Sequence, residues 1–282
     1  MSNKFLGQFL LEKGIITPQQ LLTALELQKE FNPSLGQLAV KQGYIDNDAA
    51  NKINLEQQRT DQRFGDLAIS LGYMDNTQVD ELFYVQQSTR KFFGEILVEQ
   101  GFIDHATLEA ELSEHKALKQ QAELELDNAI NNHQHRKLIT NTLQTFVKSF
   151  TRIPKIPTQV SGVLAGTPKV SDDHYVVSQR ANMVQTFKIG MVAPSELMKV
   201  LGTNFLGFDT SENEALYTDA VSELLNIILG NVLVINGEQQ TELSPPQVER
   251  NGDDITEGFN QCFAVEMSAG GHDFNIFFMY ND

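Results

Sequence analysis

The sequence has little of several residue types, and each shortage excludes a class of protein. Its single cysteine, Cys262, excludes an internal disulfide and a thiolate cluster for a metal. Only 21 Lys and Arg stand against 37 Asp and Glu, so the net charge is −16 and long nucleic acids or anionic membranes are unfavourable partners. No run approaches 18 consecutive apolar residues, and the first residues lack the pattern of a signal peptide. We therefore expect no membrane span and a cytoplasmic location.

What is present suffices for two folded domains. The chain has 282 residues, of which 41% are hydrophobic, enough to bury a sizeable core. Residues 1–137 carry 13 basic and 20 acidic side chains, and residues 138–282 carry 8 and 17. Neither half therefore has the basic excess that binding to a nucleic-acid polymer requires.

Glycines recur every 29 residues in the first half of the chain. One series is Gly7, Gly36, Gly65 and Gly94, and a second is Gly14, Gly43, Gly72 and Gly101. Three positions after each glycine of the second series stand the helix-capping residues Thr17, Asp46, Asp75 and Asp104. The copies close on Gln28, Gln57, Gln86 and His115. This spacing predicts an all-α domain of four helix pairs over residues 1–115.

Each copy is expected to contain a short helix and then a longer one. In the first copy the short helix covers about Leu6–Lys13, and Gly14 follows its end, where a left-handed backbone favours glycine. The second helix starts after Thr17 and is predicted to bury Leu21 and Leu25. The equivalent pairs are Ala50 and Asn54, Val79 and Phe83, and Leu108 and Leu112. The polar Asn54 predicts weaker packing in the second copy.

Residues 6–28, LGQFLLEKGIITPQQLLTALELQ, resemble the N-terminal domain of type II secretion and pilus-assembly ATPases. That family includes the MshEN type, which binds cyclic di-GMP through repeated R-L-G-x-x-L-x-x-x-G motifs. The resemblance implies a cyclic di-GMP site at Arg63 and Gly65, because only the third copy has the arginine. The other copies have Phe5, Ser34 and Phe92 there. The alternative is a helical scaffold whose glycines are caps and close-packing points, and which presents a surface to a partner.

A connector and then a different pattern follow the repeats. Residues 116–137 are rich in helix formers and have no Gly or Pro, which predicts a connector helix with His133 and His135 at a solvated end. Helices are predicted over Leu138–Ile153, Pro194–Leu201 and Glu212–Gly230. Strands are predicted over Gln159–Val170, Tyr175–Val177, Met183–Val192, Thr241–Arg250, Phe259–Ser268 and Phe274–Tyr280, with a hairpin turn at Gly270-Gly271. This order has no βαβ cadence, so residues 138–282 are expected to form an α+β domain with an antiparallel sheet.

The predicted helix Glu212–Gly230 carries a polar stripe opposite an apolar one. Its apolar side gathers Tyr217, Val221, Leu224, Leu225, Ile228 and Val232. Asp219, Glu223, Asn226 and Gly230 lie on the opposite side. A carboxylate and a carboxamide three residues apart therefore share a face, and the glycine leaves room for an approaching molecule. A solvated face with an incidental asparagine is the alternative.

The pattern D-x3-E-x2-N of Asp219, Glu223 and Asn226 resembles the signature of the CheC/CheX/FliY family of chemotaxis phosphatases. The resemblance covers about 140 residues, although Pro245 and Pro246 fall a few residues earlier than in the family. The opening helix of the domain has Asn141 but no E-x2-N motif, which corresponds to the CheX arrangement with one active helix.

The CheX-like resemblance implies a function, a partner and roles for the stripe. It implies a phosphatase that removes the aspartyl phosphate of a CheY-like response regulator, a reaction that needs an aligned water and charge stabilisation. Glu223 would pair with a lysine of the regulator and Asn226 would orient the water, with Asp219 and Gly230 in supporting roles. The regulator would bring its own Mg²⁺, so no cofactor or metal site is expected in this chain, and a homodimer through the sheets is implied. The alternative is a non-enzymatic scaffold that binds a response regulator or cyclic di-GMP.

Overall fold

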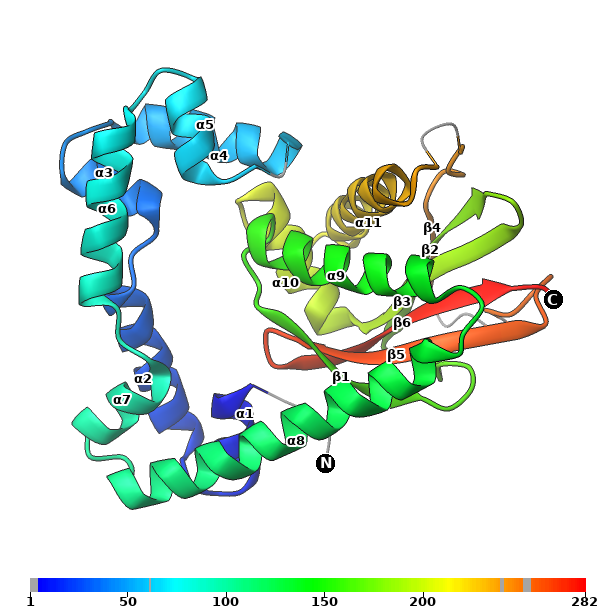
Figure 1. Cartoon of the computed structure of the whole chain (residues 1–282), viewed down its shortest axis with the longest axis horizontal. Helices are drawn as coiled ribbons and strands as arrows, with labels where there is room; N and C mark the ends of the chain where they lie inside the picture. The colour runs from blue at the N-terminus through cyan, green and yellow to red at the C-terminus, as the bar shows by residue number, and fades with distance from the viewer. Residues whose placement is uncertain (1–4, 61, 239–240, 251–254) are drawn as a thin grey trace. The chain divides into compact units, whose positions relative to one another are not determined.

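Two compact units make up the chain in the computed structural model, which describes residues 5–60, 62–238, 241–250 and 255–282. The N-terminal unit is Leu6–His115, and the C-terminal unit contains Lys116–Asp282 (Figure 1). The boundary between the units falls within one continuous helix, α8 (His105–Asn131). Each unit is described by itself.

Short and long helices alternate through the N-terminal unit. They are α1 (Leu6–Glu12), α2 (Pro18–Phe31), α3 (Leu35–Lys41), α4 (Asn47–Thr60), α5 (Phe64–Ser70), α6 (Asn76–Thr89), α7 (Phe93–Glu99) and the first part of α8. The glycines after the short helices, Gly14, Gly43, Gly72 and Gly101, all have φ between 67° and 75°. The side chains of Thr17, Asp46, Asp75 and Asp104 each accept a backbone N–H three residues on. The predicted glycine ends and helix caps are therefore confirmed.

Each glycine of the first series marks a close contact with another helix, and at Gly7 and Gly36 that contact includes a helix of a different copy. A Cβ on Gly36 would lie 3.0 Å from the Phe64 ring, and one on Gly7 would lie 3.2 Å from the Phe93 ring. The second copy thus packs on the third through α3 and α5, and the first packs on the fourth through α2 and α7. These glycines are close-packing points, as the scaffold interpretation predicts.

The prediction that Leu25 and its equivalents are buried is wrong. Leu25 is 46% exposed, and Phe83 and Leu112 are each 41% exposed. The long helices instead bury the residue one position earlier, which is Ala24, Ile53 and Leu82 in the first three copies. Because Ile53 is fully buried, the second copy is packed after all, and the buried stripe has a three-residue rather than a four-residue step.

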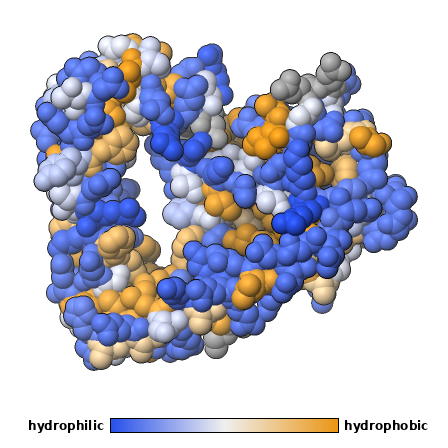
Figure 2. Space-filling view, in the orientation of Figure 1, coloured by the Kyte–Doolittle hydropathy of each residue, from blue (hydrophilic) through white to orange (hydrophobic). Residues whose placement is uncertain are grey.

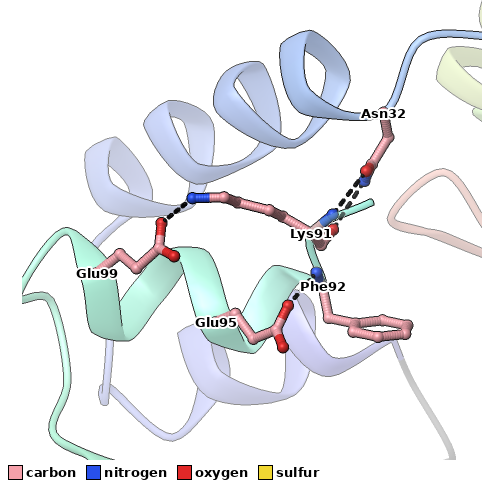
Figure 3. A network of polar contacts seen from close by, with 5 residues as sticks. All are labelled: Asn32, Lys91, Phe92, Glu95 and Glu99. Carbon is pink, nitrogen blue, oxygen red and sulfur yellow. Dashed lines mark hydrogen bonds and ion pairs between the residues drawn. The ribbon is translucent and has the colours of Figure 1, made fainter. Parts of the chain in front are cut away.

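Hydrogen bonds tie two connections of the N-terminal unit together (Figure 3). The Asn32 side chain donates to the Lys91 carbonyl (2.8 Å) and accepts from the Lys91 N–H (2.9 Å). The Glu95 carboxylate accepts from the Phe92 N–H (2.7 Å). Gln86, one of the recurring glutamines, donates to the Pro33 carbonyl (3.0 Å). The link from α2 to α3 is thus fastened to the link from α6 to α7.

The C-terminal unit has an α+β fold, as predicted. After α8 come α9 (Arg136–Arg152), β1 (Thr158–Leu164), β2 (His174–Asn182), β3 (Thr186–Pro194), α10 (Ser195–Leu206), α11 (Glu214–Asn236), β4 (Gln247–Arg250), β5 (Gln261–Ala269) and β6 (His272–Tyr280). Within the described residues the strands form one antiparallel sheet in the order β1-β5-β6-β3-β2-β4. The predicted turn at Gly270-Gly271 is confirmed, since both glycines have positive φ and Ala269 pairs with His272.

Both faces of this sheet are covered by the chain itself. Helices α9, α10 and α11 pack on one face and form the main core with it (Figure 1). On the other face Val192, Phe277 and Met279 form a second cluster with Ile255 and the partly buried Phe259. The strands alternate between the two clusters, so β6 is buried on both sides.

Two predicted helix ends were placed too early. Helix α10 continues through Gly202, where a Cβ would lie 2.5 Å from the Tyr217 Cβ, and it ends at Gly207 with φ 79°. Helix α11 continues through Gly230 and ends at Gly237 with φ 83°. Gly202 and Gly230 therefore have helical backbones, and the left-handed glycines that end each helix come later.

The prediction that His133 and His135 lie on a solvated helix end is also wrong. Both are half-buried between α8 and α9, and the His133 Nε2 lies 2.9 Å from the Tyr280 hydroxyl. The His135 ring contacts the rings of Phe187 and Tyr280. Burial lowers the pKa of each histidine. The aromatic ends of β3 and β6 give these imidazoles an apolar surface to pack on.

Candidate active site on helix α11

Helix α11 lies across the helix-covered face of the sheet and displays the predicted stripes. The side chain of Asn213 caps its start by accepting the Leu216 N–H. The predicted apolar side is confirmed, since Tyr217, Val221, Leu224, Leu225, Ile228 and Val232 are all buried. This burial fixes the rotation of the helix and thereby decides which polar residues reach the surface.

By length and composition, α11 is the one helix among the described residues that could cross a membrane. Half of its most apolar window is buried within the unit. A core helix meets the same criteria, and α11 has nine buried residues. The finding therefore gives only weak support to a membrane span.

Asp219 and Glu223 are exposed on the polar side of α11. Among the described residues, neither carboxylate has a hydrogen-bond or ion-pair partner. They line a surface depression of about 500 Å³ together with Ala215, Thr218, Ser222, Pro246 and Val248. Pro246 immediately precedes β4, so this depression lies between α11 and the edge of the sheet. A carboxylate in this state can receive a cationic group from outside.

Asn226 lies one turn further along α11 and is half-buried rather than fully outward. Its Oδ1 accepts a hydrogen bond from Gln179 Nε2 at 3.0 Å. Its Nδ2 has no hydrogen-bond partner within the described part of the chain. The structure thus places Asn226 at the border between α11 and β2, beside the depression but not among its lining residues.

Gly230 faces open space. A Cβ built there meets no atom of the described residues within 4 Å, so packing among them does not require a glycine. The expected room beside the stripe is therefore present. Figure 2 shows apolar side chains on the surface over α11, a helix on which Leu216, Val234 and Ile235 are exposed.

Gln179 was not among the predicted site residues, because the sequence predicts the second strand only over Tyr175–Val177. The strand continues to Asn182, and Gln179 faces the helices in line with Tyr175 and Val177. No sequence pattern marked it, because Ser178, Gln179 and Arg180 are three consecutive polar residues and break the alternation that predicts a strand. Asn141, noted on the opening helix, donates to Asn236 Oδ1 at 3.0 Å and is thereby engaged within the unit.

Arg63 and Gly65 lie at the start of α5 in the N-terminal unit. Arg63 is exposed and makes no side-chain cap. Gly65 is buried, and a Cβ there would lie 3.0 Å from Val79 Cγ1 and 3.5 Å from Leu35 Cδ2. Packing against α6 of its own copy and against Leu35 of the second copy thus explains this glycine, and cyclic di-GMP binding stays a prediction.

In the described part of the chain, the other reactive side chains do not gather into a second centre. Among the described residues, no group of three or more His, Cys, Asp or Glu side chains is placed to hold a metal ion. Cys262 is partly buried beside the second cluster of the sheet, and burial raises the pKa of its thiol. The α11 stripe offers two carboxylates and a carboxamide, which can supply charge and positioning.

No family model and no curated protein matches the chain. Solved structures similar to it include the chemotaxis protein CheX from Desulfovibrio desulfuricans, at 15% identity and a TM-score of 0.41, covering 52% of this chain and 98% of that one. CheX from Vibrio vulnificus is 15% identical with a TM-score of 0.44, covering 51% and 99%. The CheX-CheY-BeF3-Mg+2 complex from Borrelia burgdorferi is 14% identical with a TM-score of 0.40, covering 51% and 98%. The similarity is one of backbone over about half of this chain, and these solved structures are chemotaxis proteins of the CheX type.

Proposed function

We propose that the C-terminal unit is a phosphatase that hydrolyses the aspartyl phosphate of a CheY-like response regulator. The observation that carries the proposal is the arrangement of two residues on α11. Glu223 is exposed and has no partner among the described residues, and Asn226, one turn on, accepts a hydrogen bond from Gln179 of β2. The D-x3-E-x2-N resemblance names the family in which this arrangement has that use. Gly230, which no internal packing requires, adds a place for close approach of another molecule.

The proposed reaction needs little from this chain besides positioning. The water oxygen bonds to phosphorus as the bond between phosphorus and the aspartate oxygen breaks, and the phosphate leaves with both water protons. Asn226 Nδ2 and the second lone pair of Oδ1 can hold that water in line with the breaking bond. The regulator brings the Mg²⁺ and the lysine that neutralise charge on the transferred group.

Glu223 has a different task in this proposal. Its carboxylate has no partner among the described residues, so it can pair with the lysine of the regulator and fix the docked orientation. Asp219 lies one turn before Glu223 on α11 and lines the same depression. Its negative charge would help to attract the regulator, and it would not contact the reacting atoms.

The test is phosphate release from a phosphorylated CheY-like regulator with the full-length chain. We expect Asn226→Ala to reduce the acceleration by ~10²-fold, as loss of a single aligned polar group does in other enzymes. Glu223→Gln should raise KM for the phosphorylated regulator by about tenfold, which corresponds to about 1.4 kcal/mol of docking energy.

Glu212→Gln is the matched control, since it removes one exposed carboxylate just before α11 without touching the stripe. Equal effects of the Glu212 and Glu223 variants would show a general charge effect and contradict the assigned role of Glu223. Binding of the beryllofluoride-activated regulator without any acceleration would refute the phosphatase and support a non-enzymatic binding module.

A further inference from the structure

Gln179 is a buried carboxamide in an otherwise apolar row of β2. It is 1% exposed, and its neighbours on the same face of the strand, Val177 and Ala181, belong to the buried hydrophobic residues. An apolar side chain would fill this position without the cost of removing a polar group from water. Packing alone therefore does not explain why an amide occupies this position.

Of the two polar groups of the Gln179 amide, only Nε2 forms hydrogen bonds with the described residues. Nε2 donates to Asn226 Oδ1 at 3.0 Å and to the Ser244 carbonyl at 2.9 Å. Oε1 is buried and has no hydrogen-bond partner among the described residues. A buried unpaired carbonyl is unfavourable, and such groups in folded proteins call for a functional explanation.

The bond to Asn226 restricts a torsion that is otherwise loose. The terminal torsion of an asparagine is broad, so a free carboxamide on a helix samples many orientations. With Oδ1 held by Gln179, the amide plane is fixed and Nδ2 is left for an incoming group.

The bond to Ser244 extends the same restraint to the wall of the depression. Ser244 is also tied to β2, because its N–H donates to the Arg180 carbonyl (2.8 Å) and its Oγ accepts from the Arg180 N–H (2.9 Å). Pro246, two residues on, lines the depression beside Glu223. One buried amide thus connects Asn226 with the segment that borders the Glu223 side of the stripe.

We propose that Gln179 is a positioning residue that holds the Asn226 carboxamide in the orientation that aligns the attacking water; this inference rests on the proposed phosphatase function. On this proposal, the fold with Gln179 is less stable than it would be with an apolar residue at the same position. Replacing it by an apolar side chain of similar size should lower catalysis while leaving the fold intact.

The test compares Gln179→Met with Tyr175→Phe in the full-length chain. Tyr175 lies on the same strand and face, and its hydroxyl bonds to Glu214 (2.7 Å) and Tyr217 (2.9 Å) of α11, so Tyr175→Phe also removes buried hydrogen bonds between β2 and α11. Gln179→Met should lower kcat at least about tenfold, within the ~10²-fold that a misplacement of about 1 Å can cause. KM for the phosphorylated regulator should not rise, and the melting temperature should not fall. Tyr175→Phe should keep kcat.

NMR of the Asn226 side-chain amide supplies a readout that does not depend on activity. Its order parameter should fall in Gln179→Met and stay unchanged in Tyr175→Phe. If the wild-type chain is active and Gln179→Met keeps its kcat, or if the amide stays equally ordered, the positioning inference is overturned. If the wild-type chain accelerates no phosphate release, the proposed function itself fails, and the two failures are thereby distinguished.

Discussion

Gly202 and Gly230 both lie inside helices, yet they exist for opposite physical reasons. Gly202 is pressed against Tyr217, so its missing side chain is required by packing between α10 and α11. At Gly230 no atom of the described residues lies within 4 Å of where a Cβ would be. The glycine also weakens its helix, since glycine in a helix interior costs roughly 0.5–1 kcal/mol of stability relative to alanine. Because packing among the described residues does not require a glycine at position 230, contact with a partner can be the reason for it.

Gly230→Ala is therefore expected to raise the melting temperature and weaken docking together. The unfolding free energy should rise by roughly 0.5–1 kcal/mol, because the helix gains propensity at no steric cost. KM for the phosphorylated regulator should rise about fivefold or more, since a methyl group then occupies the space that the partner approaches. Calorimetry and steady-state kinetics on one preparation give both values.

Gly202→Ala is the counterpart, and it should lose about 1–3 kcal/mol of stability through overpacking against Tyr217. If the Gly230 variant instead loses stability, or if it keeps its KM, the reading of Gly230 as open interface space is wrong.

Among the single residues of the site, Glu223 and Asn226 could be predicted from the sequence, whereas Gln179 could not. The first two share a helix, where a 3.6-residue period determines which residues lie on one face. Gln179 comes to Asn226 from a strand 47 residues away, and only the pairing of the sheet with α11 brings them together. The half-buried state of Asn226 was likewise outside what a helical period alone can show.

Among the elements, the helices were located well and their ends poorly. The stripe of α11 follows from periodicity, but its C-terminal end was placed at Gly230 instead of before Gly237, because several glycines are plausible stops and only backbone geometry selects one. In the repeats the left-handed glycines were predicted correctly, whereas Leu25 is exposed and its neighbour Ala24 is buried in its place.

The junction between α8 and α9 should make the C-terminal unit sensitive to mild acid. Burial lowers the pKa values of His133 and His135 below 6.5, so below that pH the unfolded chain binds more protons than the folded chain. The free energy of unfolding should therefore fall as the pH drops from 7 through the lowered pKa values. Thermal unfolding followed by circular dichroism at a series of pH values measures this slope.

The variant His133→Gln with His135→Gln should flatten the slope, while His105→Gln, at an exposed histidine, should keep it. Equal slopes in the wild type and the double variant would contradict the assignment of acid sensitivity to this pair.

At the scale of the whole molecule, the sheet bears on the homodimer that the family resemblance implies. Phe277 is 0% exposed on the face away from the helices, where Ile255 and Phe259 pack into the same cluster. Pairing through this face would require those segments to leave it, and their apolar residues would then be exposed to water.

We accordingly expect no homodimer that pairs through this face: if light scattering gives a mass above the 31.6 kDa of one chain, that mass should persist when residues on this face are substituted. A mass of two chains that is lost on substitution of residues on this face would contradict that expectation.

The most direct test of the central claim is the rate of phosphate release from a phosphorylated CheY-like regulator, with the wild-type chain and with Asn226→Ala. We expect acceleration by the wild type and a loss of ~10²-fold in the variant, measured at a temperature at which both proteins are folded. Equal acceleration by both proteins would contradict the proposal, because the water would then be aligned without the Asn226 carboxamide that Gln179 holds.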